Sequence, residues 1–135
     1  MNVILCIDNH KGLLFHNRRQ SRDEKVIEKI KGVVGQQELY VNEFSHALFE
    51  GFCIIVQEPL QCAKEGTYCF VENVDIASSL DRIEQLYIFK WNRDYPHDFS
   101  LKVDYQKLFE LVYTEDFKGK SHEKITMEVW RKCTE

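Results

Sequence analysis

The amino-acid sequence predicts a single α/β domain that spans residues 1–135 and contains one mixed sheet with helices. A length of 135 residues suits one domain, since domains run to about 100–200 residues. Short apolar runs typical of strands alternate with one strong helical pattern, which is the arrangement of an α/β sheet. Two long segments flank a glycine near the C-terminus, and their alternating character predicts an antiparallel hairpin at one edge of the sheet.

The first part of the chain supplies an N-terminal strand and the main helix. Asn2–Ile7 is a continuous apolar run, as expected of a strand that is buried on both faces. Ser21 and Glu24 have the spacing of a capping box, and apolar residues recur after them at helical intervals. We therefore expect a helix over about Ser21–Lys31, which ends where Gly32 interrupts the pattern.

Short strands and the hairpin account for the remainder of the chain. Four further strands are predicted from β-branched and aromatic runs between turn residues, at Glu38–Val41, Phe52–Val56, Thr67–Val71 and Gln85–Trp91. The segment Asn42–Glu50 between two of them fits a short helix. The hairpin arms are expected at Leu108–Phe117 and His122–Arg131, around Gly119 and Lys120. The sheet then has about six or seven strands.

Composition and charge exclude several classes of protein. With 44% hydrophobic and 30% charged residues, the chain has enough apolar surface to fold, which excludes disordered and collagen-like proteins. No apolar run approaches the roughly 20 residues that span a bilayer, and the first residues lack the pattern of a signal peptide. The net charge of −4 speaks against general electrostatic binding of nucleic acid. We therefore expect a cytoplasmic protein that contacts no membrane.

Cysteine and histidine are distributed without an obvious site. The five cysteines stand at irregular spacings and include no Cys-x-x-Cys motif, so reduced thiols explain them best, with Cys6 as a buried thiol in the first strand. A disulfide or a zinc site is the alternative. The five histidines are scattered along the chain, and we predict neither a metal site nor a bound cofactor.

A cluster of polar residues before the main helix is the strongest candidate site. Its guanidinium groups flank a helix start, where free N–H groups and the positive end of the helix dipole favour an anion. The predicted ligand is a phosphate, a nucleotide or a carboxylate, and the neighbouring Phe15 and His16 favour one that carries a flat ring. The candidate ligand-binding residues are Arg18, Arg19, Gln20, Ser21 and Arg22. The alternative is a solvated basic loop whose arginines pair with acidic neighbours.

Two other motifs are assigned to structure rather than to chemistry. Ser121, His122 and Glu123 adjoin one another in a hairpin arm, where neighbouring side chains point to opposite faces and cannot converge as a triad. We therefore place them on the surface. The segment Phe89–Tyr95 alternates aromatic and polar residues, which indicates strand packing, with a ligand-binding wall as the alternative. No catalytic residue is predicted.

The order of these elements, with several local motifs, resembles the dihydrofolate reductase fold. The first part of the chain is similar in its buried strand, Asp, Gly and aromatic residue, here Val3–Ile7, Asp8, Gly12 and Phe15. The last part is similar in a Leu-Tyr-Leu-type strand, an aromatic-Pro pair and a long hairpin, here Leu86-Tyr87-Ile88, Tyr95-Pro96 and Phe109–Arg131. The resemblance covers most of the chain and implies the same α/β architecture with a trimmed cofactor half.

The functional residues of that family are not retained. The resemblance places Gln20 near the family's proton-donating carboxylate, and an amide cannot act as an acid; a three-residue slip would give that role to Asp23. The family's phosphate-holding Gly-Arg-x-Thr segment is replaced by Asn42–Ser45, in which Glu43 repels a phosphate. The interval Glu72–Gln85 contains no glycine, so the family's diglycine turn is missing. These departures imply no NADPH-dependent reduction.

Four segments resemble a narrower group, the small bacterial proteins of uncertain function that are sometimes labelled ribonuclease Z. The segments are Arg18–Ser21, Tyr68–Asp75, Phe89–Arg93 and Ser121–Thr126. The ribonuclease label requires a His-x-His-x-Asp-His metal cluster, which this sequence does not contain.

The sequence therefore favours a small cytoplasmic protein with a degenerate dihydrofolate reductase-like fold. We expect it to lack reductase activity and to bind a small anionic ligand or a protein partner, with a homodimer as one arrangement for a shortened sheet. One alternative is an NADPH-dependent reductase that uses Asp23. The other is a nucleic-acid-associated protein that uses residues 10–31, which hold a local excess of basic residues.

Overall fold

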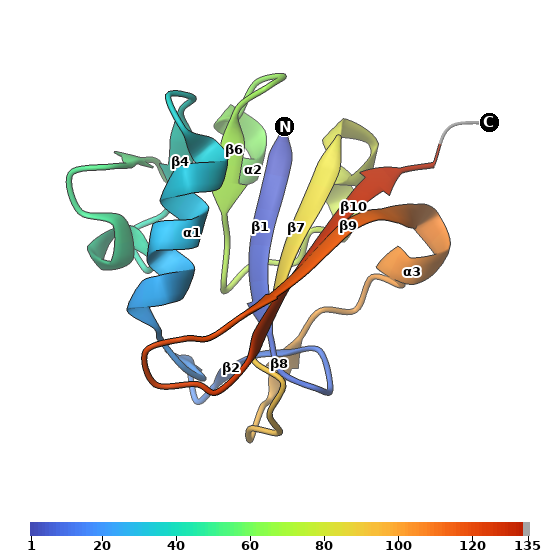
Figure 1. Cartoon of the computed structure of the whole chain (residues 1–135). Helices are drawn as coiled ribbons and strands as arrows, with labels where there is room; N and C mark the ends of the chain where they lie inside the picture. The colour runs from blue at the N-terminus through green and yellow to red at the C-terminus, as the bar shows by residue number, and fades with distance from the viewer. Residues whose placement is uncertain (134–135) are drawn as a thin grey trace.

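The computed structural model describes residues 1–133, and a seven-stranded mixed sheet runs through its centre (Figure 1). The strands that these residues form are β1 (Asn2–Ile7), β2 (Gly12–Phe15), β3 (Arg18–Arg19), β4 (Leu39–Val41), β5 (Ile54–Ile55), β6 (Tyr68–Phe70), β7 (Gln85–Lys90), β8 (Phe99–Ser100), β9 (Phe109–Phe117) and β10 (Ile125–Lys132). The order across the main sheet is β5-β4-β6-β1-β7-β10-β9.

The chain direction divides the main sheet into two parts. The strands β5, β4, β6, β1 and β7 are parallel to one another, whereas β10 runs antiparallel to both β7 and β9. The predicted mixed α/β sheet and its C-terminal antiparallel hairpin are therefore confirmed. The predicted strand Phe52–Val56 is shorter than expected, because only Ile54 and Ile55 pair with β4.

Helices cover both faces of the sheet. The helical elements are α1 (Glu24–Val34), α2 (Pro59–Cys62), α3 (Tyr105–Leu108) and the two 3₁₀ helices η1 (His46–Phe49) and η2 (Ala77–Arg82). One face packs against α1 around Ile4, Phe70 and Phe89. The opposite face packs against α2 and α3 around Leu5 and Ile88. Since β1 contributes to both cores, its continuous apolar sequence matches its position.

The main helix begins and ends later than the sequence predicted. Ser21 is not its cap. Asp23 has an extended φ of −149° and its carboxylate accepts a hydrogen bond from the Lys25 N–H, so the helix begins at Glu24. It continues through Gly32, whose missing side chain breaks the apolar pattern without breaking the helix, to a C-cap at Gly35.

A second, small sheet of order β3-β2-β8 lies at the lower end of the molecule in Figure 1. The sequence did not predict it. A two-residue turn joins β2 to β3, and both of its residues have a positive φ, 52° at His16 and 61° at Asn17. Such a turn matches the twist of a hairpin, and it places the candidate arginines of β3 beside the carboxyl ends of the parallel strands.

The edge strand β9 carries exposed apolar side chains. Leu111, Val112 and Tyr113 are each between 41% and 51% exposed, on a strand whose outer hydrogen-bonding edge has no neighbour among the described residues. The homodimer considered from the sequence stays a prediction. No helix within the described part of the chain has the length and apolar character needed to cross a membrane.

Candidate functional site

A cleft opens at the carboxyl ends of β6, β1 and β7, against the first turn of α1. The cavity inside it has a volume of about 20 Å³, and Cys6, Phe70 and Trp91 are among the residues that line it. Its rim is formed by the residues that precede α1. Clefts outside the carboxyl ends of parallel strands are the usual ligand sites of open α/β sheets.

Ser21 and Asp23 line this cleft, and hydrogen bonds join each of them to the ring of His122. The Oγ atom of Ser21 lies 2.9 Å from Nε2 of His122, and Nδ1 of the same ring lies 2.8 Å from Oδ2 of Asp23. A carboxylate can only accept, so Nδ1 carries a proton, and in a neutral ring Nε2 is then left to accept from the serine hydroxyl. The Tyr95 hydroxyl lies 3.2 Å from Nε2.

The placement of His122 corrects the sequence analysis, which assigned it to the surface. The residue is only 4% exposed, and its ring stacks on Trp91 with 4.7 Å between centroids. The neighbours Ser121 and Glu123 are exposed, as expected. The local alternation of a hairpin arm carries no information on this arrangement, since Ser21 and Asp23 lie about a hundred positions away from His122.

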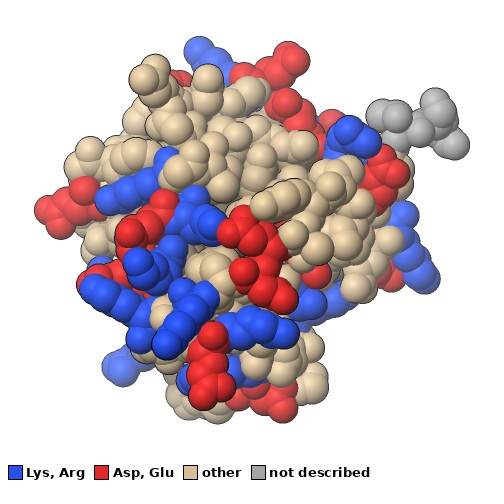
Figure 2. All heavy atoms as spheres, in the orientation of Figure 1, with Lys and Arg blue, Asp and Glu red and all other residues tan. Residues whose placement is uncertain are grey.

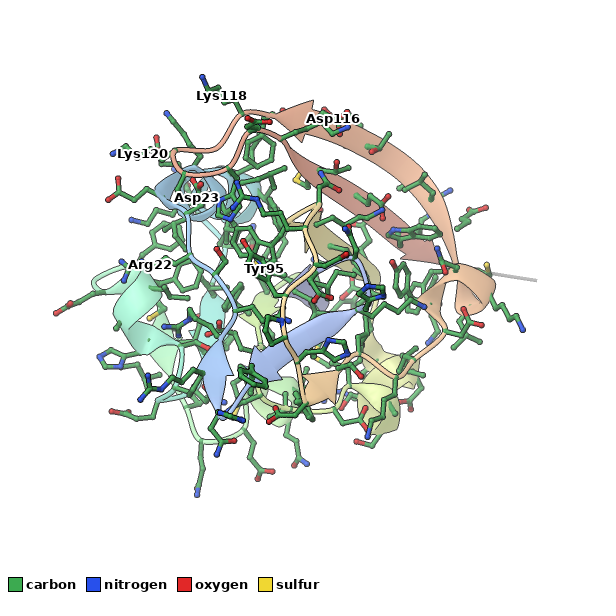
Figure 3. The ribbon with its side chains drawn as sticks, turned by 90° about the horizontal axis from the view of Figure 1, so that it is seen from below. Arg22, Asp23, Tyr95, Asp116, Lys118 and Lys120 are labelled. Atoms are coloured by element: carbon green, nitrogen blue, oxygen red, sulfur yellow. The ribbon has the colours of Figure 1, made fainter. Side chains whose placement is uncertain are left out.

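Asp23 connects the start of α1 to the tip of the β9–β10 hairpin (Figure 3). Besides the Lys25 N–H and the His122 ring, its carboxylate accepts hydrogen bonds from the backbone N–H groups of Lys120 and Ser121 and from the Ser121 hydroxyl. Burial alone would raise the pKa of Asp23, but these donors outweigh burial and hold that pKa well below its usual value. The carboxylate therefore stays ionised.

Gly119 allows this close contact between the hairpin tip and the helix start. A Cβ atom at this position would lie 2.5 Å from Oδ2 of Asp23 and 2.8 Å from Cδ1 of Ile125. Neither neighbour can withdraw, because Asp23 is held by its donors and Ile125 is fully buried. The predicted turn at Gly119 thus carries a packing requirement in addition to a change of chain direction.

Arg19, one of the predicted ligand-binding residues, is engaged inside the protein. Its guanidinium group donates to both carboxylate oxygens of Glu72, at 2.9 and 2.8 Å, and to the backbone carbonyl of Phe44. The Ser45 hydroxyl donates to the same carboxylate at 2.7 Å. This group of side chains links β3 to the segments that follow β4 and β6.

Gln20 has an amide whose orientation is fixed by its partners. Its Nε2 donates to Oδ2 of Asp8 and to the carbonyl of Pro96, and both of these groups only accept. The Oε1 atom is consequently turned away, and it is buried without a hydrogen-bond partner among the described residues. Asp8 also accepts from the Gly12, His10 and Tyr95 N–H groups, which outweigh the effect of burial and lower its pKa.

Arg18 and Arg22 remain available at the rim. Within residues 1–133 neither guanidinium group has an ion-pair or hydrogen-bond partner, and both side chains are exposed. Arg22 lines the cleft, whereas Arg18 lines an adjoining hollow with Phe15 and Tyr95. Figure 3 shows Arg22 turned outward and Asp23 turned inward under the hairpin loop. Lys and Arg side chains gather over the lower end of α1 and the hairpin tip (Figure 2).

Cys6 is a lining residue of the cleft. Burial, the largest effect, raises the pKa of the Cys6 thiol, with a further contribution from the Glu72 carboxylate, so this cysteine stays protonated. No group of three or more His, Cys, Asp or Glu side chains in the described residues could hold a metal ion.

Comparison with known proteins assigns the fold and no more. No protein-family model matches the sequence, and no match is found among curated protein sequences. Among solved structures, the chain is similar to a dihydrofolate reductase from Enterococcus faecalis complexed with NADP(H) and RAB-propyl. The TM-score is 0.72 at 8% sequence identity, and the match covers 98% of this chain and 96% of that chain. The dihydrofolate reductase-like fold expected from the sequence is confirmed.

Proposed function

We propose that the protein binds a small anionic ligand, one that carries a flat ring and a hydrogen-bond donor, at the rim of the cleft and in the hollow that adjoins it. The observation that carries the proposal is the orphaned Oε1 atom of Gln20, a residue that lines both the cleft, with Arg22, and the adjoining hollow, with Arg18. A buried acceptor without a donor costs about 1–3 kcal/mol, and a ligand N–H or O–H removes that cost. The arginines supply the charge for a phosphate or carboxylate.

The adjoining hollow supports the flat ring. Phe15 stacks on His16 with 3.8 Å between ring centroids, and both rings border the hollow that Arg18 and Tyr95 share. An aromatic ligand placed there gains apolar contact with several rings. Its acidic group can then reach the rim arginines.

Reductase activity is not part of the proposal, because two features of the cleft oppose it. The Asp23 carboxylate accepts five hydrogen bonds and is ionised, so it has no proton to give to a bound heterocycle. In the resembling family, the segments after β4 and β6 hold the cofactor. Here Ser45 and Glu72 occupy these segments, and both are already engaged, Ser45 as a donor to the Glu72 carboxylate and Glu72 in its ion pair with Arg19. The residues do not fit NADPH.

Binding of nucleic acid through residues 10–31 is the weaker alternative. Three of the basic side chains in this segment are already paired with carboxylates: Arg19 with Glu72, Lys25 with Glu28, and Lys29 with Glu115. These acids offset much of the local positive charge. If no small ligand bound, a protein partner would instead be favoured.

Thermal unfolding of the wild type with added ligands tests the proposal. The panel contains NADPH, a folate analogue and a series of nucleotides. A ligand present at 100 times its dissociation constant should add about 2.7 kcal/mol to the free energy of unfolding, which raises Tm by several degrees. We expect this shift from an anionic heterocycle and none from NADPH.

Paired variants make the same test specific to the cleft. Replacing both Arg18 and Arg22 with alanine should lower the affinity for the ligand that raises Tm by about tenfold or more, since each substitution removes a charged hydrogen bond. The matched variant, with Lys64 and Lys102 replaced by alanine, loses two exposed charges elsewhere and should keep full affinity. Equal affinity in the two variants, a clear shift with NADPH, or no shift with any member of the panel would contradict the proposal.

A further inference from the structure

The hydrogen-bonded chain of Ser21, His122 and Asp23 is more than the ligand-binding proposal requires. Binding an anion needs donors, whereas here a serine hydroxyl donates to a histidine that a buried carboxylate orients. The two distances, 2.9 and 2.8 Å, lie within the normal range for hydrogen bonds in proteins. The three side chains come from two segments far apart in the sequence, so the fold brings them together.

We propose that Ser21 is an activated nucleophile and that the cleft cleaves small carboxylic esters. Ser21 lines the cleft and is only half-buried, so an ester that binds at the rim meets this residue. The bare Nε2 of His122 is positioned to take the hydroxyl proton. Asp23 does not touch the substrate; it positions the ring and favours the charge that the ring acquires.

The surroundings of the imidazole fit this role. Trp91 covers one face of the ring, and the ring itself is buried, which excludes most water from the hydrogen bond to Asp23. The Tyr95 hydroxyl lies 3.5 Å from Ser21 Oγ and can donate to a negative oxygen formed on the attacked carbon. The arginine Arg22 at the same cleft favours esters with an acidic group.

The reaction is balanced with water as the second substrate. Ser21 Oγ forms a bond to the ester carbonyl carbon while its proton moves to Nε2 of His122. The bond from that carbon to the alkoxy oxygen breaks, and Nε2 returns the proton to the leaving alcohol. Water then gives a proton to Nε2 and its oxygen attacks the acyl carbon. The bond to Oγ breaks, Ser21 recovers the proton, and the carboxylic acid leaves.

Labelling with diisopropyl fluorophosphate tests the nucleophile directly. Ser21 Oγ attacks phosphorus, fluoride leaves, and His122 passes the serine proton to it, so the protein gains one diisopropylphosphoryl group. Mass spectrometry of the intact protein and of its peptides gives the number and the position of adducts. The probe is neutral, so this test does not depend on the rim arginines or on the proposed anionic ligand.

Three variants decide the outcome. Ser21→Ala and His122→Gln should each lose the adduct, whereas Ser78→Ala, which removes an exposed hydroxyl on η2, should keep it. Circular dichroism and thermal unfolding confirm that each variant is folded, and Ser21→Ala alone decides if His122→Gln does not fold. A wild type without an adduct, an adduct on Tyr95 or any other residue, or an adduct that persists in Ser21→Ala would overturn the proposal.

Discussion

Replacing Asp23 with alanine should lower the free energy of unfolding by about 4 kcal/mol, the largest effect expected of any single substitution in the cleft. The change removes the helix N-cap, which is worth about 1 kcal/mol. It also leaves the Lys120 and Ser121 N–H groups and the His122 ring without their acceptor, each at a further cost of about 1 kcal/mol or more. Denaturant unfolding followed by circular dichroism measures the difference.

A neighbouring acid provides the control for this prediction. Glu24→Ala removes an exposed carboxylate whose ion-pair partner among the described residues is Lys120, and it should leave stability almost unchanged. If Asp23→Ala cost less than about 1 kcal/mol, the hydrogen bonds at Asp23 would not hold the hairpin to the helix in solution.

The same carboxylate should make stability depend on acid. Because folding lowers the pKa of Asp23 from its usual 3.8, the stabilisation is fully present above that pH and is lost as the pH falls toward the folded-state value. The Tm of the wild type should therefore fall steeply as the pH drops below about 4, and the Tm of Asp23→Asn should fall less steeply. If Tm changed with pH in the same way in the two proteins, Asp23 would not be the cause of the acid sensitivity.

Replacing Arg19 with methionine should cost about 3 kcal/mol, the second largest effect. The substitution keeps most of the apolar stem but leaves the Glu72 carboxylate, only 8% exposed, without its two charged donors. Breaking a buried pair from one side costs about 3–5 kcal/mol, and the lower figure applies since the Arg19 side chain is 26% exposed. Denaturant unfolding again gives the difference.

A double variant separates the lost ion pair from a general disturbance. Adding Glu72→Gln to Arg19→Met removes the unpaired charge, so at least half of the lost stability should return. Arg18→Met, at the exposed neighbour, should have little effect. A double variant as unstable as Arg19→Met would contradict the explanation, because the cost would then lie in packing rather than in charge.

The elements that follow from local pattern were predictable from the sequence. The apolar run of β1 and the alternation in the hairpin are each long enough for the spacing of apolar residues to indicate a strand. The small sheet was not predictable, because β3 and β8 have two residues each and their hairpin depends on positive φ values at His16 and Asn17. Neither residue type demands such a turn by itself.

The candidate site was predicted only where it depends on neighbours in the sequence. The segment Arg18–Arg22 does border the cleft and its adjoining hollow. That Arg19 turns inward depends on Glu72, which lies 53 positions away. The N-cap is Asp23 rather than Ser21 because the hairpin tip supplies extra donors to Asp23. The burial of His122 depends likewise on α1 and Trp91, which no local pattern reveals.

The central claim is that Asp23 and Ser21 hold the His122 ring between them, and nuclear magnetic resonance tests it most directly. Long-range proton–nitrogen correlations at pH 8, with His122→Gln to assign the signals, report which ring nitrogen carries the proton. We expect a single tautomer with the proton on Nδ1 and none on Nε2, and a loss of this preference in Asp23→Asn. A ring that carries its proton on Nε2, or one that averages between the two tautomers, would contradict it.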